Sequence, residues 1–541
     1  MDGTHESARL SAAQLRDRAA IVAGSLSAAG VDRDEVALLI AAPPIEFLVG
    51  LMGCLWAGVI AAPVAFPRRV EHLETRVEPV RANAGATAIV AGPPQGDTER
   101  TVLELLGGGE LPIVPTNATA ASAIDPVGDR RIAYLQYTSG STSEPRGVVV
   151  THDNLIANLD VIHHLLDFED DSILVSWCPL THDMGLVMGA LPAIAFGLTS
   201  VLMPPGEFVR RPMAWMRALS EWDGTHGYSP NFGYDLCVDR STPQDRAALD
   251  LSKVRCLVNG AEQVRNLTRD RFVEAFAPAG LRPEAHRPAY GLAEATVLVS
   301  CATAENSNTV VWVESAGLEQ NEVRFVDGGS PGARPLVGDG VVGPGYEVRI
   351  VDPVGREILG DGRVGELWLG GPSVSPGYWS RAEETQEVFG GLIPGEDGRA
   401  YLRTGDLAFI HDDQIIICGR AKDLIVIHGR NIHPHDVELT AELAHEAARI
   451  GGTAAFSIDD GGTEALVIVV EVDGQPEEAP IVEAIRSAVL REFELHVADV
   501  LLVKPREIPK TSSGKKQRSM TRRLWQEARS PSVPRGISSP G

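Results

Sequence analysis

The stretch Tyr137-Thr-Ser-Gly-Ser-Thr-Ser-Glu-Pro-Arg-Gly147 follows the apolar run IAYLQ at residues 132–136. Its glycines and small hydroxyl side chains let backbone N–H groups approach an anion closely, and the hydroxyls add further donors. The pattern G-x-x-x-x-G-K-[ST] is absent from the sequence, so this is not the phosphate loop of a P-loop NTPase. The stretch therefore indicates a phosphate-binding loop at a strand end, with an ordinary polar loop between strand and helix as the alternative.

Short apolar runs alternate with helical segments over most of the chain. They lie at residues 36–40, 59–64, 87–92, 173–178, 199–204 and 254–258. Uninterrupted β-rich runs between amphipathic helices are typical of parallel strands that are covered on both faces. The sequence therefore predicts an α/β fold with a large N-terminal domain of parallel-type sheets and helices.

Residues 47–66 carry no charge and reach the length of a membrane-spanning helix. The stretch nevertheless contains Gly50, Gly53, Gly58 and Pro63, and it ends in the strand-like run VIAAPV. We interpret it as a buried helix followed by a buried strand, and we expect no membrane span.

The residue pattern changes near residue 344, where short strand-like segments that are separated by glycine and proline begin. We expect an N-terminal domain over residues 1–420, with a β-rich subdomain at about 344–420. Helices and strands then follow in quick succession, which indicates a small, mobile α+β C-terminal domain over residues 421–527. The tail at 528–541 is rich in Ser, Pro and Gly and is predicted to be disordered.

Length and composition agree with a globular protein of two or three domains, because the chain has 541 residues, 44% of them hydrophobic and 22% charged. The formal charge of −25 argues against nucleic acid as a partner, since nucleic-acid binding needs basic surface. The six cysteines form no C-x-x-C pair, and the first residues lack a signal region. These features favour a cytoplasmic protein without a zinc site or a disulfide framework.

Five further clusters place charged residues beside glycine. They are Asn259-Gly-Ala-Glu-Gln263, Tyr290-Gly-Leu-Ala-Glu-Ala-Thr296, Tyr401-Leu-Arg-Thr-Gly-Asp-Leu407, Gly419-Arg-Ala-Lys-Asp423 and Pro509-Lys-Thr-Ser-Ser-Gly-Lys-Lys-Gln-Arg518. Open α/β sheets bind ligands at the carboxyl ends of their strands, where acidic side chains hold ribose hydroxyls or a magnesium ion on phosphates. Taken singly, the first three are better explained as turns, and the last as a solvated basic run.

In this order the six motifs resemble those of the adenylate-forming superfamily, which comprises acyl-CoA synthetases, peptide-synthetase adenylation domains and luciferases. The resemblance extends from about residue 10 to residue 523. It implies an enzyme that binds ATP and a carboxylic acid between a large N-terminal domain and a mobile C-terminal domain.

Three features are most similar to the fatty acyl-AMP ligases of that superfamily. Ser176-Trp-Cys-Pro-Leu-Thr-His-Asp-Met-Gly-Leu186 resembles their S-W-x-P-x-x-H-D-M-G-L stretch, and Ala293 stands where many acyl-CoA synthetases have Thr. An extra segment at about residues 314–338 lies where those ligases carry an insertion that is thought to limit the use of CoA.

On the nucleotide side, the resemblance implies a phosphate loop, an adenine border, a ribose pair and a magnesium ligand. The phosphate loop comprises Thr138, Ser139, Gly140, Ser141 and Thr142. The adenine border comprises Gly260, Ala261 and Glu262, and Tyr290 and Gly291 also belong to the ATP site. Asp406 and Arg420 form the ribose pair, and Glu294 is the magnesium ligand, with Thr142 as a second metal ligand. The implied cofactors are ATP and Mg2+.

On the acid side, the resemblance implies that Lys515 contacts both the carboxylate and the α-phosphate, and that Lys422 is the hinge of domain rotation. The predicted catalytic residues are Lys515, Glu294 and His182. Four side chains are expected to line the acid pocket, although such residues are equally consistent with plain core: Trp177, His182, Met184 and Phe232.

The implied reaction joins a carboxylic acid, fatty or a bulky natural-product acid, to AMP with release of pyrophosphate. An acyl carrier protein would then take the acyl group on its phosphopantetheine thiol. One alternative is an acyl-CoA synthetase that uses free CoA, and another is a catalytically silent nucleotide-binding subunit. The acid and the oligomeric state stay open.

Two more features bear on this hypothesis. Arg146 replaces the lysine that is usual in the family's phosphate loop, and a planar guanidinium differs from a point charge. A basic run is expected to attract an acidic carrier protein, or simply to solubilise a tail: Lys504, Arg506, Lys510, Lys515, Lys516 and Arg518.

Overall fold

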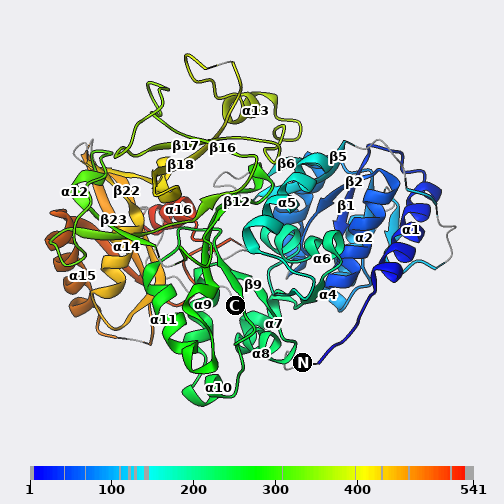
Figure 1. The fold of residues 1–541 in the computed structure, drawn as a ribbon, viewed down its shortest axis with the longest axis horizontal. Coiled ribbons are helices and arrows are strands. Elements are labelled where there is room, and N and C mark those ends of the chain that lie inside the picture. Colours follow the sequence, from blue (N-terminus) through cyan, green and yellow to red (C-terminus); the bar gives the residue numbers. More distant parts are fainter. Residues whose placement is uncertain are drawn as a thin grey trace.

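The computed structural model describes residues 5–41, 43–67, 69–108, 111–119, 124–126, 131–138, 145–307, 309–396, 398–427, 430–460, 463–474, 476–511 and 515–529. Figure 1 shows the N-terminal elements on one side, the C-terminal elements on the other, and the elements of the largest sheet between them. Parallel strands alternate with helices through the first half of the chain. The predicted α/β fold class with a small C-terminal module is confirmed.

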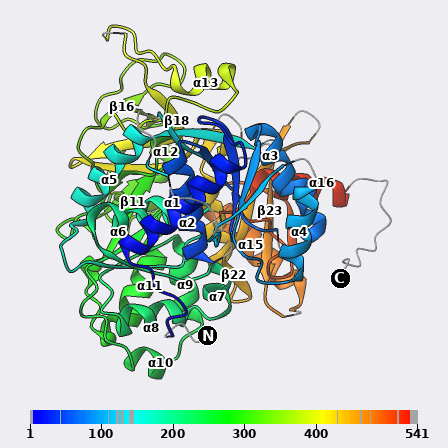
Figure 2. The ribbon, with the colours of Figure 1, turned by 90° about the vertical axis from the view of Figure 1, so that its right-hand side faces the viewer.

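The first sheet contains six strands in the order β4-β3-β1-β2-β5-β6. Its strands are β1 (Val36–Ile40), β2 (Ile60–Pro63), β3 (Ala88–Ala91), β4 (Ile113–Pro115), β5 (Ile132–Thr138) and β6 (Arg146–Thr151). All neighbours are parallel except β5 and β6, which form an antiparallel hairpin. The helices near this sheet, best seen in Figure 2, are α1 (Ala12–Ala28), α2 (Pro44–Ala57), α3 (Glu78–Ala84) and α4 (Asp97–Gly107).

The uncharged stretch at residues 47–66 folds as most of helix α2 followed by strand β2, as predicted. The helix ends at Gly58, whose φ of 73° is a left-handed conformation that favours glycine. Within the described residues, no helix is long and apolar enough to cross a membrane.

The second sheet contains eleven strands in the order β16-β17-β18-β19-β15-β12-β11-β10-β9-β7-β8. They are β7 (Ile173–Ser176), β8 (Thr199–Leu202), β9 (His226–Ser229), β10 (Cys256–Asn259), β11 (His286–Gly291), β12 (Leu298–Cys301), β15 (Val341–Val342), β16 (Glu347–Val351), β17 (Gly365–Gly370), β18 (Leu402–His411) and β19 (Gln414–Arg420). Neighbours from β8 to β11 are parallel, and those from β11 to β16 are antiparallel. The segment expected as a β-rich subdomain thus continues the parallel sheet through β15 and β12 and does not close into a separate sheet.

Helix α5 connects the two large sheets. It begins after Thr151, whose hydroxyl accepts from Asn154 N while the Asn154 side chain accepts from Thr151 N. Further along α5, the buried Asn158 amide donates to Leu298 O at 2.8 Å and accepts from Leu298 N at 3.2 Å, which holds the helix on β12. The helices in this part of the chain are α5 (His152–Leu166), α6 (Leu191–Phe196), α7 (Pro205–Arg210), α8 (Met213–Glu221), α9 (Asn231–Asp239), α10 (Pro243–Ala247), α11 (Asn266–Phe276) and α13 (Ala382–Phe389).

The C-terminal module has a three-stranded sheet and a hydrophobic core of its own. Its elements are β20 (Ile425–Ile427), β21 (Arg430–Ile432), α14 (Pro434–Leu443), β22 (Ala448–Asp460), β23 (Thr463–Val472), α15 (Glu478–Phe493), β24 (Val497–Val503) and α16 (Arg518–Arg529). Helix α16 includes the first two residues of the predicted tail, and residues 530–541 lie outside the described residues.

The predicted insertion folds against this module. It begins at the end of strand β13 (Val310–Glu314), continues into the short helix α12 (Ser315–Leu318), and returns as strand β14 (Ala333–Val337), which pairs antiparallel with β13. In Figure 1, α12 lies on the same side of the molecule as α14 and α15. The insertion is therefore placed to contact the C-terminal module.

Candidate active site

A cavity of about 370 Å³ lies between the N-terminal body and the C-terminal module. Pockets of roughly 300–1,000 Å³ are typical of small-molecule sites. The cavity brings together most of the residues singled out from the sequence. Those that line it are Thr138, Arg146, Trp177, His182, Met184, Gly260, Ala261, Glu262, Tyr290, Gly291, Glu294, Asp406, Arg420, Lys422 and Lys515.

The phosphate-loop candidate joins two antiparallel strands and not a strand and a helix. Thr138 at the end of β5 pairs with Arg146 at the start of β6. Ser139, Gly140, Ser141 and Thr142 lie outside the described residues. The two ends of the stretch nevertheless reach the cavity wall.

Arg146 is oriented by side chains that the sequence motifs do not include. Its Nε lies 2.8 Å from Glu384 Oε2, and its guanidinium lies 5.8 Å from the centre of the Tyr378 ring. The Tyr378 hydroxyl in turn donates to Glu294 Oε1 at 2.7 Å. The unusual arginine is thus held in a fixed direction beside the predicted magnesium ligand.

Asp406 and Arg420 form a cross-strand pair on β18 and β19. Arg420 Nε donates to Asp406 Oδ1 at 2.8 Å, and the Tyr290 hydroxyl donates to Asp406 Oδ2 at 2.7 Å. Asp406 raises the pKa of the Arg420 guanidinium, so the guanidinium keeps its charge. The sequence placed Asp406 at a strand end, whereas it lies inside β18 and faces the cavity.

The segment Gly260-Ala261-Glu262 follows β10 and has a strained backbone. Ala261 has a φ of 69°, a left-handed conformation that residues with a side chain rarely adopt. A Cβ on Gly260 would lie 2.8 Å from Ala289 O, so only glycine allows these strands to approach. Such strain is common where a backbone is shaped around a ligand.

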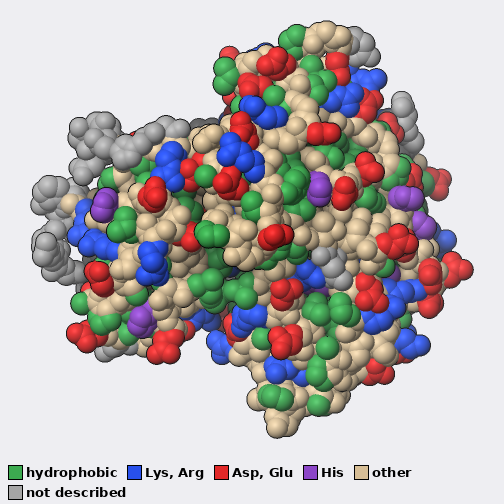
Figure 3. All heavy atoms as spheres, turned by 60° about the vertical axis from the view of Figure 1, so that its left-hand side comes forward, with side chains coloured by type: hydrophobic (Ala, Val, Ile, Leu, Met, Phe, Trp, Pro, Cys, Tyr) green, Lys and Arg blue, Asp and Glu red, His purple; other side chains and the backbone are tan. Residues whose placement is uncertain are grey.

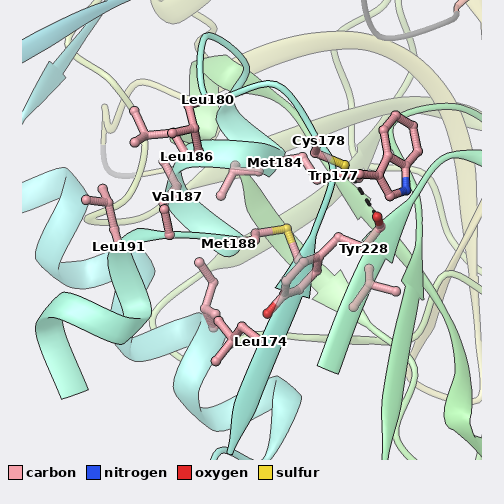
Figure 4. Close-up of a cluster of buried hydrophobic side chains, with 14 of the residues drawn as sticks. Leu174, Trp177, Cys178, Leu180, Met184, Leu186, Val187, Met188, Leu191 and Tyr228 are labelled. Atoms are coloured by element: carbon pink, nitrogen blue, oxygen red, sulfur yellow. Dashed lines mark hydrogen bonds between the residues drawn. The ribbon is translucent and has the colours of Figure 1, made fainter. Parts of the chain in front are cut away.

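The acid side of the cavity is aromatic and apolar. Trp177 stacks on Phe208 with ring centres 3.8 Å apart, and Phe232 packs edge-on to Trp177 at 5.5 Å. Phe232 is thus a second layer behind Trp177 and is absent from the described lining residues, contrary to the prediction. Figure 4 shows the turn from Trp177 to Leu191 passing over Leu174 and Tyr228, with Met188 beside the Tyr228 ring.

Lys515 reaches the cavity from the C-terminal module. Burial and the nearby Arg420 charge lower the pKa of its ammonium group, whereas Asp183, Asp406 and Glu262 raise it. None of these carboxylates lies within 4 Å of Lys515 Nζ among the described ion pairs. The cation is therefore incompletely neutralised, which favours an anionic ligand at this point.

Two neighbours of Lys515 at the acid side respond to its charge. Burial, with a further contribution from Lys515, lowers the pKa of His182 to about 4, so the imidazole is neutral at physiological pH. Burial raises the pKa of Asp183, and Lys515 opposes that increase. Asp183 was missed as a site residue, although it belongs to the quoted His-Asp-Met-Gly stretch.

Adjacent side chains explain why Lys515 points inward. Lys516 Nζ pairs with Glu438 and donates to Thr453 O at 2.8 Å. Arg518 binds the same carboxylate, with Nε 2.7 Å from Glu438 Oε1, and lies 3.2 Å from Asp423 Oδ2. These contacts hold the segment at Lys516 and Arg518 in place, so that Lys515, which precedes it, faces the cavity.

The predicted basic docking run is therefore only partly correct. Lys504, Arg506 and Lys510 are exposed, but the remaining three cations of the run contact the cavity or buried carboxylates. On the face shown in Figure 3, acidic and basic side chains are interspersed. Lys515, Lys516 and Arg518 are thus directed towards the interior of the protein.

Two comparisons bear on the family. A model of the AMP-binding enzyme family matches residues 2–379, and a model of the AMP domain of Disco-interacting protein 2-like proteins matches residues 422–533. The chain belongs to the AMP-binding enzyme family. ATP is the nucleotide of this family, and the resemblance drawn from the six motifs is confirmed.

Relatives within the family are similar over nearly their whole length. The medium-chain-fatty-acid acyl-carrier-protein ligase JamA of Moorena producens is 38% identical over 539 residues, covering 96% of this chain and 90% of that protein. The long-chain-fatty-acid–AMP ligase FadD26 of Mycobacterium marinum is 36% identical over 537 residues, covering 94% and 89%. A structure from a study of fatty acyl-adenylate ligases of E. coli and L. pneumophila has a TM-score of 0.88 at 30% identity, covering 97% of this chain and 94% of that one.

Replacing Lys515 with alanine should lower acyl-adenylate formation about 100- to 1,000-fold, because one cation at the reacting phosphate is lost. ATP binding should persist, since Arg420 and Asp406 are untouched. Single-turnover formation of acyl-AMP and ATP calorimetry measure the two effects. Lys253→Ala, an exposed lysine on the N-terminal body, is the control. Normal adenylation by Lys515→Ala would show that another group contacts the phosphate.

The His182 imidazole should titrate near pH 4 in the intact protein, and its pKa should rise in Lys515→Ala because the repelling cation is gone. Nitrogen chemical shifts of labelled histidine, followed from pH 4 to 8, measure both values. A His182 pKa near 6.5 that is unchanged by the substitution would mean that Lys515 lies outside the cavity in solution.

Proposed function

We propose that the protein joins a fatty acid to AMP, releases pyrophosphate, and then transfers the acyl group to the phosphopantetheine thiol of a carrier protein. The observation that carries this proposal is the position of Lys515. It enters from the C-terminal module between the apolar side of the cavity and the Asp406–Arg420 pair. A cation there can contact a carboxylate and an α-phosphate together.

In the first step a carboxylate oxygen attacks the α-phosphorus in line, and the bond to the pyrophosphate oxygen breaks. Little covalent help is required, so orientation and charge stabilisation account for most of the rate. Lys515 would neutralise charge that spreads over the α-phosphate, while neutral His182 would border the carboxylate without adding charge. Asp406 would accept from the ribose hydroxyls.

Glu294 would hold Mg2+, which would supply charge neutralisation at the phosphates. A magnesium site built from one carboxylate and substrate phosphates is usual for nucleotide enzymes. The donor set fits this arrangement, because Glu294 offers a carboxylate in the cavity wall close to Arg146, at the end of the predicted phosphate loop. The Tyr378 hydroxyl would fix the direction of the Glu294 carboxylate.

The apolar side of the cavity supports a fatty acid as substrate. Trp177, Met184 and Met188 form this wall, and the named relatives act on medium-chain and long-chain fatty acids. Trp177 lines the cavity, and its Nε1 is buried without a hydrogen-bond partner in the described structure. A polar group along the acyl chain would satisfy such an atom, so hydroxylated or oxidised acids belong in a substrate panel.

The insertion supports a carrier protein as the acceptor. Glu319 binds Arg430 through two contacts of 2.7 and 2.8 Å, and Arg334 Nε lies 2.6 Å from Asp436 Oδ1. Both pairs join the insertion to the C-terminal module. The second pair is largely buried, so moving the C-terminal module away from the insertion breaks a charge-assisted hydrogen bond. Free CoA offers little contact area to compensate for that loss, whereas a docked protein offers more.

The direct test is acid-dependent exchange of labelled pyrophosphate into ATP, measured over fatty acids of increasing length. We expect exchange with at least one fatty acid, followed by accumulation of acyl-AMP with CoA and its consumption with a phosphopantetheinylated carrier. Rapid acyl-CoA formation would favour the synthetase alternative. Absence of exchange with every acid would contradict acyl-adenylate formation.

Weakening the contacts of the insertion should open the enzyme to CoA. The double variant Glu319→Ala, Arg334→Ala should raise acyl-CoA formation by about tenfold or more, because each 1.4 kcal/mol of lost restraint is a factor of ten. Acyl-AMP formation should change much less. Arg324→Ala is the matched control, since the ion pairs of Arg324 with described residues are those with Glu314 and Glu322 of the same segment. Equal rates of acyl-CoA formation in the wild type, the double variant and Arg324→Ala would show that the insertion does not limit the use of CoA.

A further inference from the structure

Asp339 is a buried carboxylate in the cavity wall to which the six motifs assign no role. It lies between β14 and β15, is 3% exposed, and lines the same cavity as Tyr290 and Asp406. Its backbone is fixed on both sides, because its N–H donates to Ile415 O at 2.8 Å and its carbonyl accepts from Ser300 Oγ at 2.8 Å. The carboxylate therefore has a defined position.

One oxygen of this carboxylate remains available to a ligand. Among the described residues, the only hydrogen bond of the side chain is the one that Oδ2 accepts from Ile417 N at 3.2 Å. Burial raises the pKa of Asp339 to about 7, and the charge of Asp406 adds to that increase. A buried carboxylate with a single donor favours a second N–H donor from whatever fills the cavity.

The neighbours of Asp339 indicate which part of a nucleotide it would meet. The N–H of Ile417 donates to Asp339 Oδ2, and the carbonyl of the same residue accepts from Gln263 Nε2 at 2.9 Å. Gln263 directly follows the strained Gly260–Glu262 segment. Ile417 lies on β19 three residues before Arg420, which is a step of about 10 Å along a strand. Asp339 is thus displaced from the Asp406–Arg420 pair towards the segment that would border the base.

We propose that Asp339 selects adenine by accepting a hydrogen bond on Oδ1 from the exocyclic amino group of the base. This inference rests on the proposed function for the placement of ribose at Asp406. Adenine presents an N–H donor at that position, whereas hypoxanthine and guanine present an oxygen acceptor. Above the Asp339 pKa of about 7 the side chain is a carboxylate that only accepts, so an acceptor facing it leaves both groups unpaired. Sites built for a hydrogen bond reject such analogues strongly, and the binding comparison is therefore made above that pH.

The alternative is that Asp339 acts only within the protein by holding Ile417 and so the end of β19. The variant Asp339→Asn separates the two roles. Its amide oxygen can still accept from Ile417 N, while its amide nitrogen turns the cavity-facing atom from an acceptor into a donor. Asp413→Asn is the matched control, because Asp413 is exposed at the tip of the same β18–β19 hairpin with a φ of 59° that asparagine tolerates.

The experiment is calorimetric binding of ATP, ITP and purine riboside triphosphate, with Mg2+, to the full-length wild type and both variants. The wild type should bind ATP about 10- to 100-fold more tightly than either analogue, the size expected for one charge-assisted hydrogen bond. Asp339→Asn should reduce the ratio of ATP to ITP affinity by about the same factor, and Asp413→Asn should not change it.

Two outcomes would overturn the proposal. One is equal affinity of the wild type for ATP and purine riboside triphosphate, a comparison that needs no variant and so holds even if Asp339→Asn is unstable. The other is an equal loss of ATP and ITP affinity in a folded Asp339→Asn, which would assign Asp339 a purely structural role. Failure of the proposed function would appear differently, as nucleotide binding without acid-dependent pyrophosphate exchange.

Discussion

The arrangement of the protein depends on one cation carried across a domain boundary. Lys515 belongs to the C-terminal module but lies in a cavity that is lined by both the N-terminal body and the C-terminal module. Burial and Arg420 lower the pKa of its ammonium group, and the nearest carboxylates compensate only in part. The position persists because the following residues, Lys516 and Arg518, bind the buried Glu438. An anion in the cavity would supply the missing partner, so the same geometry that disfavours the empty site favours a phosphate in it.

In the proposed reaction, a separate contact would oppose the movement of the C-terminal module that follows adenylation. A thiol can reach an acyl adenylate only when the C-terminal module moves away, and the pair between Arg334 and Asp436 resists that movement. Exposed ion pairs stabilise a protein by about 0–1 kcal/mol. A largely buried pair such as Arg334–Asp436 instead fixes the relative orientation of the two segments that it joins. Under the proposed function, the insertion would link the choice of acceptor to domain motion, with Lys422, in the turn at Ala421–Asp423, as the predicted hinge.

Much of this arrangement is predictable from the sequence, and the exceptions have physical causes. Buried parallel strands produce uninterrupted apolar runs, so β1, β2 and β3 were found close to their observed bounds. Glycine-containing motifs identified the cavity because close backbone approach requires glycine, as at Gly260. Asp339 and Glu384 were missed because each acts through a long-range contact that no local pattern records. Phe232 was misplaced for the converse reason, since an aromatic residue looks the same in sequence whether it lines a pocket or supports the side chain that does.

The central claim is that a carboxylate oxygen attacks the α-phosphorus of ATP in the cavity that contains Lys515. Supplying a fatty acid labelled with 18O in both carboxyl oxygens, together with ATP, Mg2+ and a carrier protein, tests it most directly. Attack at the α-phosphorus leaves one labelled oxygen in the bridge of the acyl adenylate, and the thiol then releases AMP that retains it. Mass spectrometry should therefore find one 18O atom in AMP and none in pyrophosphate. Unlabelled AMP, or label in pyrophosphate or phosphate, would contradict the mechanism.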